Sequence, residues 1–371
     1  MPASPSLLIV PARFKTGKLY TQIATTSAGV VLGSSGDFNV TRATTATRFN
    51  SAGLIESVAS GVPRLDYYTS GGTAGCPALL VEPSGSNGIL NSQDTATNWA
   101  LGPNLTSGYV DVIGVSGNNL TVAASGSGIG SSAGALRRTS NNVALASGST
   151  YTISFLMRQT GTHTIGGYYA AITGGAAGDL GAGFNVSGSF SSGSLFAYTG
   201  ATSRIRRVER FGADVYRCSE TFTMTASGTL TTLSIGPTVS VTSDTNSASG
   251  TTIAFAAPQI ELGAVPTTFI PTTAAPVTRN ADVITLSGAV SGCIGQTEGT
   301  IYAEVDLRNL GVETYFIRID DGASTNVVSL RKLNTNNVRS AITAPTTSGT
   351  LNISSATFTA GILKIAFAYK S

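Results

Sequence analysis

Few residues in this chain are of the types that catalyse reactions or bind metal ions. His163 is the only histidine, and it lies in the sequence GTHTIGG without a nucleophile motif, so a Ser-His-Asp arrangement would depend on it alone. Cys76, Cys218 and Cys293 are far apart and show no zinc-site or redox spacing. We expect buried free thiols, with one long-range disulfide as the alternative. The sequence therefore predicts no catalytic residue, no metal site and no cofactor.

Paired carboxylates offer another route to catalysis, because two acidic side chains that flank a glycosidic bond can cleave it. Glu304 and Asp306 fall on one face of an expected strand, but a solvent-exposed strand face explains that spacing better. The sequence DDG at 320–322 is typical of a hairpin turn, and a calcium-ligand role there or around Asp94 is the lesser alternative. Polysaccharide cleavage remains an alternative without an assigned pair.

Aromatic side chains point to sugar binding, because a ring face is apolar and its polar rim can donate hydrogen bonds. Trp99 is the only tryptophan, and Tyr168, Tyr169 and Tyr198 offer further rings. These four residues are the candidate glycan-binding set. Burial in the core is the competing interpretation for each, above all for Trp99, which follows LNSQDTATN at the start of an expected sandwich.

A local cluster of positive charge comprises Arg204, Arg206, Arg207 and Arg210, in a chain of formal net charge +3. These arginines lie in a strand-like run with few basic neighbours, whereas nucleic-acid surfaces are broad basic faces with interleaved aromatics. We interpret the cluster as an exposed strand or as partners in salt bridges between subunits. No nucleic-acid partner is expected.

Strands must position all of these residues. Gly occurs 44 times in 371 residues, and charged residues make up 11% of the chain, against roughly 25% in an ordinary domain. Such a surface consists largely of hydroxyls, amides and backbone, while 41% hydrophobic residues suffice for folding. In TYTISFLM at 150–157, apolar residues alternate with mostly polar ones, which predicts a strand with one apolar face. The chain is expected to be all-β.

Three regions are expected along the chain. Residues 1–91 contain an extended, proline-interrupted start and short strands, and we assign them to docking on another protein. Between 92 and 277, short strands recur at spacings of roughly 8 to 15 residues, as in an antiparallel two-sheet sandwich. Residues 278–371 read as sequential antiparallel strands and stop directly after one, so we expect a partial second sandwich that continues beyond Ser371.

Two blocks of sequence carry a resemblance to a known family. They are RATTATRFNSAGLIESVASGVPRLDYYTSGGTAGCPALLVEP at 42–83 and APQIELGAVPTTFIPTTAAPVTRNAD at 257–282. Both resemble segments that frame a carbohydrate-binding-module-like jelly roll in tail-fibre and other virion structural proteins of tailed bacteriophages. DVYRCSETFT at 214–223 resembles a strand of that jelly roll, although Val215 stands where tryptophan is common. GTIYAEVDL and ILKIAFAYK resemble the concanavalin-like or laminin-G-like sandwich that often follows.

The resemblance implies a non-enzymatic structural subunit of a phage virion. The favoured form is a tail fibre or spike that attaches through residues 1–91 and presents β-sandwich domains for adsorption to host-surface polysaccharide. Its partners would be tail, baseplate or capsid proteins and further copies of itself, with a homotrimer as the favoured assembly. A capsid fibre or decoration protein without a receptor role is the alternative, and a polysaccharide depolymerase is the less favoured one.

The expected location follows from the same interpretation. The first residues show no signal peptide, and no apolar run approaches the length that crosses a bilayer. Assembly into a virion in the host cytoplasm, followed by release on lysis, would explain an extracellular-like composition without an export signal. We therefore expect no membrane insertion.

Overall fold

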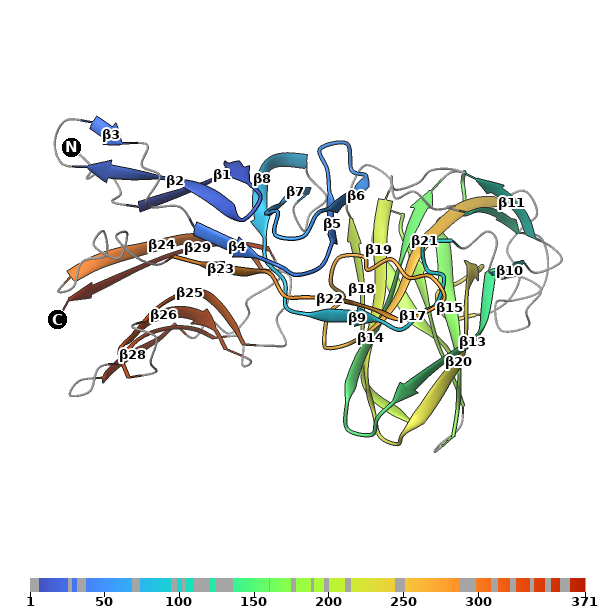
Figure 1. Cartoon of the computed structure of the whole chain (residues 1–371). Helices are drawn as coiled ribbons and strands as arrows, with labels where there is room; N and C mark the ends of the chain where they lie inside the picture. The colour runs from blue at the N-terminus through green and yellow to red at the C-terminus, as the bar shows by residue number, and fades with distance from the viewer. Residues whose placement is uncertain are drawn as a thin grey trace. The chain divides into compact units, whose positions relative to one another are not determined.

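The computed structural model describes most of the chain as strands (Figure 1). The described residues are 7–25, 29–31, 38–68, 74–94, 99–101, 105–109, 120–124, 136–159, 161–174, 178–187, 190–196, 200–210, 215–243, 251–286, 298–307, 313–320, 325–333, 337–343, 348–353 and 361–370. Within them every regular element is a strand, which confirms the all-β class. These residues include no helix long and apolar enough to span a membrane.

The chain folds as two compact units. The jelly-roll unit comprises residues 14–18 and 40–284, and the second unit comprises residues 1–13, 19–39 and 285–371. The division differs from the expected boundaries of 1–91, 92–277 and 278–371. Residues 40–91 belong with the jelly roll because their strands and ion pairs are made with residues of that unit, as described below.

Two six-stranded sheets build the jelly-roll unit. With eight strands lettered B to I along the chain (β12 to β16, then β19 to β21), one sheet contains the order B-I-D-G and the other C-H-E-F, which is the strand order of a jelly roll. The BIDG sheet runs β11 (Leu105–Tyr109), β12 (Leu120–Ala124), β21 (Thr251–Leu262), β14 (Thr150–Gln159), β19 (Val215–Met224) and β18 (Ala201–Arg210). The CHEF sheet runs β10 (Ala100–Leu101), β13 (Leu136–Leu145), β20 (Gly228–Pro237), β15 (Ile165–Thr173), β16 (Gly178–Asn185) and β17 (Ser191–Phe196).

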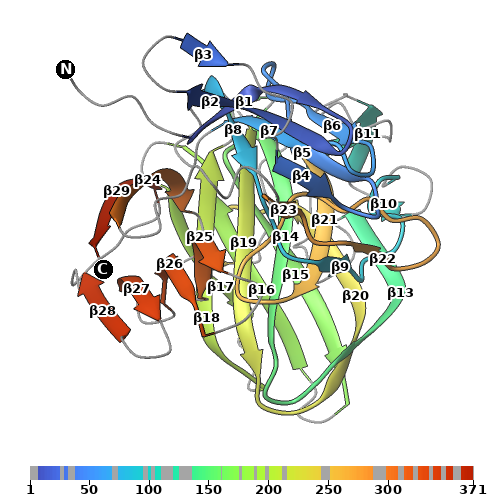
Figure 2. The same ribbon diagram turned by 60° about the vertical axis from the view of Figure 1, so that its left-hand side comes forward.

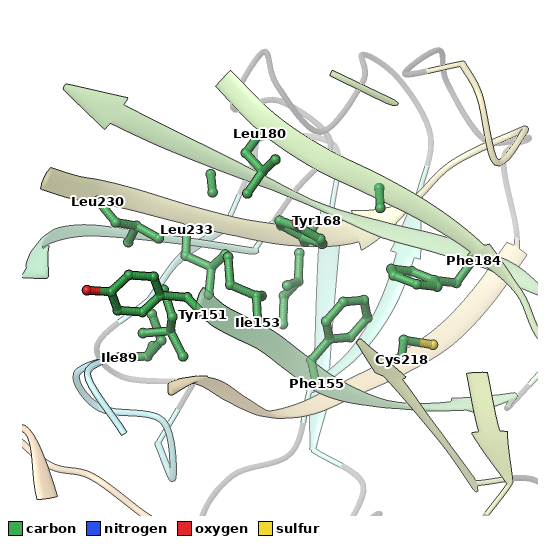
Figure 3. Close-up of a cluster of buried hydrophobic side chains, with 14 of the residues drawn as sticks. Ile89, Tyr151, Ile153, Phe155, Tyr168, Leu180, Phe184, Cys218, Leu230 and Leu233 are labelled. Carbon is green, nitrogen blue, oxygen red and sulfur yellow. The ribbon is translucent and has the colours of Figure 1, made fainter. Parts of the chain in front are cut away.

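The core lies between these sheets (Figure 3). Alternate residues of β14 point into it, and Phe155 packs edge-on against Phe184 of the CHEF sheet with ring centroids 5.8 Å apart. Burial of a side chain of this size stabilises the fold by about 1.5–3 kcal/mol. The intervening residues Thr152, Ser154 and Leu156 are buried as well. Both faces of β14 are therefore covered, whereas the sequence pattern predicted a single apolar face.

The outer cover of the BIDG sheet comes from two segments, the lead-in segment (residues 40–92) and the closing segment (residues 263–282). Phe49 and Ile55 of the lead-in segment and Phe269 of the closing segment pack with Leu156 and Ala254 of the sheet in a separate apolar cluster. The strands of the two segments are β5 (Ala46–Phe49), β6 (Ile55–Val58), β7 (Arg64–Tyr68), β8 (Ala74–Leu80), β9 (Gly85–Asn87) and β22 (Val277–Arg279). β9 pairs with β22, and the two lie side by side in both ribbon views (Figures 1 and 2).

The chain runs into and out of the jelly-roll unit on adjacent strands. β4 (Phe38–Thr41) leads into the lead-in segment, and β23 (Val283–Thr285) follows the closing segment. The two strands are hydrogen-bonded neighbours in one sheet. The polypeptide between them therefore begins and ends at one place.

The second unit has a much smaller core. Its described elements are most of β1 (Leu7–Lys15) and β2 (Lys18–Thr25), which residues 14–18 join within the other unit, and β3 (Gly29–Val31). It also contains the pair β24 (Glu298–Leu307) and β29 (Gly361–Lys370), and the sheet of β25 (Thr314–Asp320), β26 (Val327–Lys332), β27 (Val338–Thr343) and β28 (Ser348–Ile353). Only Leu330, Val338 and Ile365 form its cluster of fully buried apolar residues within the described part of the chain. Its assignment to a concanavalin-like or laminin-G-like sandwich stays a prediction.

Candidate functional site

Five charged residues from the two sequence blocks meet in one buried cluster of the jelly-roll unit, which we call the clasp. Its members are Arg42, Arg64, Glu82, Arg279 and Asp282. The Glu82 side chain is 13% exposed and the other four are at most 3% exposed. They adjoin the short strands of the lead-in and closing segments, so pairing of those strands brings them together.

Asp282 is the shared acceptor of the clasp. Arg42 donates from Nη1 to Asp282 Oδ1 at 2.8 Å, and Arg64 donates from Nη2 to Oδ2. The backbone N–H of Glu82 also donates to Oδ2, at 3.0 Å. One carboxylate of the closing segment thus holds three points of the lead-in segment that are distant in sequence.

Glu82 is the second acceptor, and it binds in the opposite direction, from the lead-in to the closing segment. Its carboxylate accepts from Arg64 Nη1 at 2.8 Å and from the backbone and hydroxyl of Thr268 at 2.8 and 2.7 Å. Burial acts to raise the pKa of Glu82, yet the charges of Arg64 and Arg279 hold it down to about 2. Glu82 therefore stays ionised at neutral pH.

Arg279 is the least satisfied member of the clasp. Its Nη2 donates to the Pro83 carbonyl at 2.8 Å, and its Nη1 lies 3.3 Å from Glu82 Oε2. Nε and Nη1 are buried and have no hydrogen-bond partner among the described residues. Burial lowers the pKa of this guanidinium.

A neutral contact fastens the same two segments beside the clasp. Asn87 donates from Nδ2 to the Ile270 carbonyl at 2.9 Å, and its Oδ1 accepts from the backbone N–H of Ile89 and Ile260 at 3.0 and 3.2 Å. Asn87 is fully buried. Asn87, four residues beyond the first sequence block, thus joins the lead-in segment, the closing segment and β21.

The structure removes two of the four candidate sugar-stacking residues. Trp99 is 4% exposed and donates from Nε1 to the Asn91 carbonyl at 3.2 Å, so it packs in the core. Tyr168 is fully buried and donates to Glu220 Oε2 at 2.5 Å. Burial, and then the Glu220 charge, raise the pKa of its phenol. Neither ring face is open to a sugar, and Tyr198 lies outside the described residues.

Tyr169 is the candidate whose ring reaches the surface. Because side chains alternate along β15, Tyr169 points away from the core when Tyr168 points into it. The Tyr169 hydroxyl donates to Asp179 Oδ1 at 3.0 Å, and its ring meets Phe196 edge-on with centroids 5.1 Å apart. We call these three residues the Tyr169 face. An aromatic pair beside a carboxylate acceptor can stack on a sugar and accept from its hydroxyls.

The two partners of Tyr169 are residues that sequence reasoning did not connect with it. Gly181 lies opposite Tyr169 on β16, and an added Cβ there would lie 2.6 Å from Phe196 Cδ2. The glycine therefore leaves room for the Phe196 ring beside Tyr169. Sequence spacing could not reveal this, because it depends on the register of β15, β16 and β17.

The arginine cluster turns inward at one edge of the sandwich. Arg204 donates from Nε and Nη2 to the two carboxylate oxygens of Glu220, at 2.5 and 2.9 Å. It also donates to the carbonyls of Phe196 and Gly181, both at 2.8 Å. Arg206 Nη2 lies 3.0 Å from Glu220. The expectation of exposed or inter-subunit arginines is thus corrected for Arg204 and Arg206. Arg204 joins the two sheets within one chain, and Arg206 pairs with Glu220 on the neighbouring strand of its own sheet.

The remaining sequence candidates show no assembled chemistry within the described part of the chain. No group of three potential metal-binding side chains occurs there. Cys218 is buried in the core, which also raises the pKa of its thiol. The carboxylates at Glu304 and Asp320 form ion pairs with Lys364 and Arg318.

Three features of the jelly-roll unit therefore deserve a functional interpretation: the clasp, the Tyr169 face and the edge closed by Arg204. The first and third hold parts of the fold together, and the second is an open surface of the CHEF sheet. No protein-family model matches the chain, and no curated protein matches its sequence.

Proposed function

We propose that this chain is a structural subunit of a bacteriophage virion, a tail fibre or spike that presents the jelly roll for adsorption to host-surface glycans. The observation that carries the proposal is the clasp. The two blocks that resemble virion structural proteins lie about 200 residues apart in sequence, as in Arg64 and Asp282, and they supply all five of its charged residues. The sequence blocks that carry the resemblance therefore supply the residues that hold the covering segments to the sandwich domain.

A buried ion-pair network such as the clasp suits a protein that is attached to a particle, because breaking any single contact of the network costs free energy. Removal of one partner leaves the other charge buried and unpaired. The lead-in segment is held to the jelly roll at Asp282, Glu82 and Asn87 together. A fibre subunit that carries force between particle and host benefits from such a joint.

The Tyr169 face supports the adsorptive part of the proposal. Its aromatic pair and carboxylate lie on the outer side of the CHEF sheet, where polysaccharide could lie along the strands. In this proposal the N-terminal region docks on tail or baseplate proteins, the subunit is a homotrimer, and the chain is part of the virion. A capsid fibre or decoration protein would use the same clasp without using the Tyr169 face.

Cryo-electron microscopy of intact particles containing this chain tests the proposal. We expect density for the chain at the tail or baseplate, around a local threefold axis, with the Tyr169 face turned outward. Density over the capsid lattice would favour the decoration alternative and contradict the receptor role. Absence of the chain from purified particles would contradict both.

A biochemical assay tests the adsorptive role separately. Purified chain is expected to bind host cells and to compete with phage adsorption. Release of shorter oligosaccharides from host polysaccharide in the same assay would instead support the depolymerase alternative.

A further inference from the structure

A groove of about 380 Å³ opens beside the clasp, and we call it the clasp groove. Its volume falls within the range of roughly 300–1,000 Å³ that is usual for small-molecule sites. The β5–β6 hairpin, the loop at 269–271 and β22 supply most of its wall. All of these elements belong to the jelly-roll unit.

Hydrogen bonds fix the walls of the groove. Thr47 donates to the Phe269 carbonyl at 2.6 Å, which joins the hairpin to the loop. Thr278 shares a 2.7 Å hydrogen bond with Ser86, which fixes β22 against β9. A site whose walls are already ordered loses little conformational entropy when a ligand binds.

Other polar side chains of the groove do not take part in hydrogen bonds that hold its walls together, within the described residues. The side chains of Thr45, Ser57 and Gln93 contribute to its lining, and no hydrogen-bond partner within the described residues is seen for them. Thr45 and Ser57 are exposed, and Gln93 is half-buried. Two hydroxyls and one amide can donate to and accept from the hydroxyls of a sugar.

Arg279 adds a positive charge to the same wall. It is 1% exposed, and its buried Nε and Nη1 lack hydrogen-bond acceptors among the described residues. Buried polar atoms normally have partners. Three arginines of the clasp form ion pairs with two carboxylates, Glu82 and Asp282. The buried Glu261 also acts on Arg279, but burial raises the pKa of Glu261, which favours its neutral form. The wall at Arg279 therefore tolerates an anionic group beside it.

We propose that the clasp groove binds an acidic saccharide, with the sugar hydroxyls at Thr45, Ser57 and Gln93 and the carboxylate next to Arg279. This inference deepens the proposed function and rests on it, since it names acidic polysaccharide as the glycan class. It places a second contact for host polysaccharide on the unit that carries the Tyr169 face. Apolar residues of the groove, including Pro271 and Val277, contact the C–H face of the sugar ring.

Ligand-observed NMR on the full chain, with glucuronic acid as probe and glucose as its neutral match, tests the proposal. We expect glucuronate to bind about tenfold more tightly than glucose, because its carboxylate is attracted by the guanidinium charge of Arg279. Equal binding of the two sugars, or no binding of either, would overturn the assignment.

Two surface substitutions locate the binding. Ser57→Trp fills the groove from an exposed position and replaces no residue of the clasp, and it is expected to abolish glucuronate binding. Ala52→Trp, in the turn of the same hairpin and outside the groove, is the matched control and should leave binding unchanged. Unaltered binding by Ser57→Trp, with folding verified by its melting temperature, would show that the sugar binds elsewhere.

The outcomes separate this inference from the proposed function. Loss of glucuronate binding in Tyr169→Ala but not in Ser57→Trp would overturn the groove assignment and leave adsorption through the Tyr169 face intact. Failure of the proposed function would appear instead in the microscopy, as a chain that is absent from the particle or buried between its neighbours.

Discussion

The two outer faces of the jelly roll differ in what covers them. The lead-in and closing segments lie over the BIDG sheet and bury even the polar residues Thr152 and Ser154 of its central strand. On the CHEF sheet, Tyr169 and Phe196 remain partly exposed. One face of the sandwich is therefore covered by the chain's own segments, while the other stays partly open. The clasp lies on the covered side, with the covering segments.

The largest expected effect comes from opening the covered side. Asp282→Ala removes the shared acceptor and leaves Arg42 and Arg64 buried without it, so a loss of about 3–5 kcal/mol in the free energy of unfolding is expected. Chemical denaturation of the purified chain measures it. Asp179→Ala on the open face is the matched control, with an expected change within about 0.5 kcal/mol. Equal losses of unfolding free energy in the two variants would contradict the proposed difference between the covered and the open face.

Acid should weaken the covered side first. Glu82 has a pKa of about 2 in the folded chain, against 4.5 for an unperturbed glutamate. A carboxylate with a depressed folded-state pKa stabilises the fold above its unfolded pKa, and this contribution of up to about 3 kcal/mol is lost as pH falls from 4.5 towards 2. Unfolding curves recorded across this window should show that slope in the parent chain. A parallel slope in Glu82→Gln would assign it to other groups.

A smaller effect is expected from crowding the open face. At Gly181 an added Cβ would meet the Tyr168 carbonyl at 2.5 Å and the Phe196 ring at 2.6 Å. Gly181→Ala should therefore cost about 1–3 kcal/mol through overpacking. Gly75→Ala, where no atom lies within 4 Å of the new Cβ, serves as the control and should be near neutral. Thermal unfolding compares the pair, and indistinguishable melting temperatures would mean that the sheet yields at Gly181.

The smallest change in stability should accompany a large change in binding. Tyr169→Ala removes a partly exposed ring, so the free energy of unfolding should fall by less than about 1 kcal/mol. Adsorption of the purified chain to host cells is expected to drop several-fold, because stacking on the ring is lost. Tyr302→Ala, at a 59% exposed tyrosine of the second unit, controls for the loss of an exposed ring. Similar adsorption by both variants would remove the Tyr169 face from the binding surface.

Strand formation could be predicted from sequence because alternation is a local property. TYTISFLM alternates, and β14 forms there. Burial of Thr152 and Ser154 was not predictable, since it depends on a segment about a hundred residues earlier that folds over them. The contacts that group residues 40–91 with the jelly roll were not predictable for the same reason: Arg42, Arg64 and Glu82 find their partners in the closing segment.

The candidate site was only partly predictable. Aromatic composition identified Tyr168 and Tyr169, but adjacent residues of a strand face opposite sides, and only the sheet register decides which one is buried. Asp179 and Phe196 join Tyr169 through neighbouring strands. The clasp was visible in sequence only as a resemblance, because ion pairing across some 200 residues leaves no local periodicity.

The adjacency of β4 and β23 has a consequence for how such a protein can change. A domain whose two ends are neighbours can be grafted into, or deleted from, a host chain without rerouting what lies on either side. Arg42 and Asp282 lie at that boundary and form an ion pair. Both partners of the pair would therefore be transferred together with the jelly-roll unit. A chain built in this way could exchange the whole jelly-roll unit by one recombination event and leave the sequence on either side unchanged.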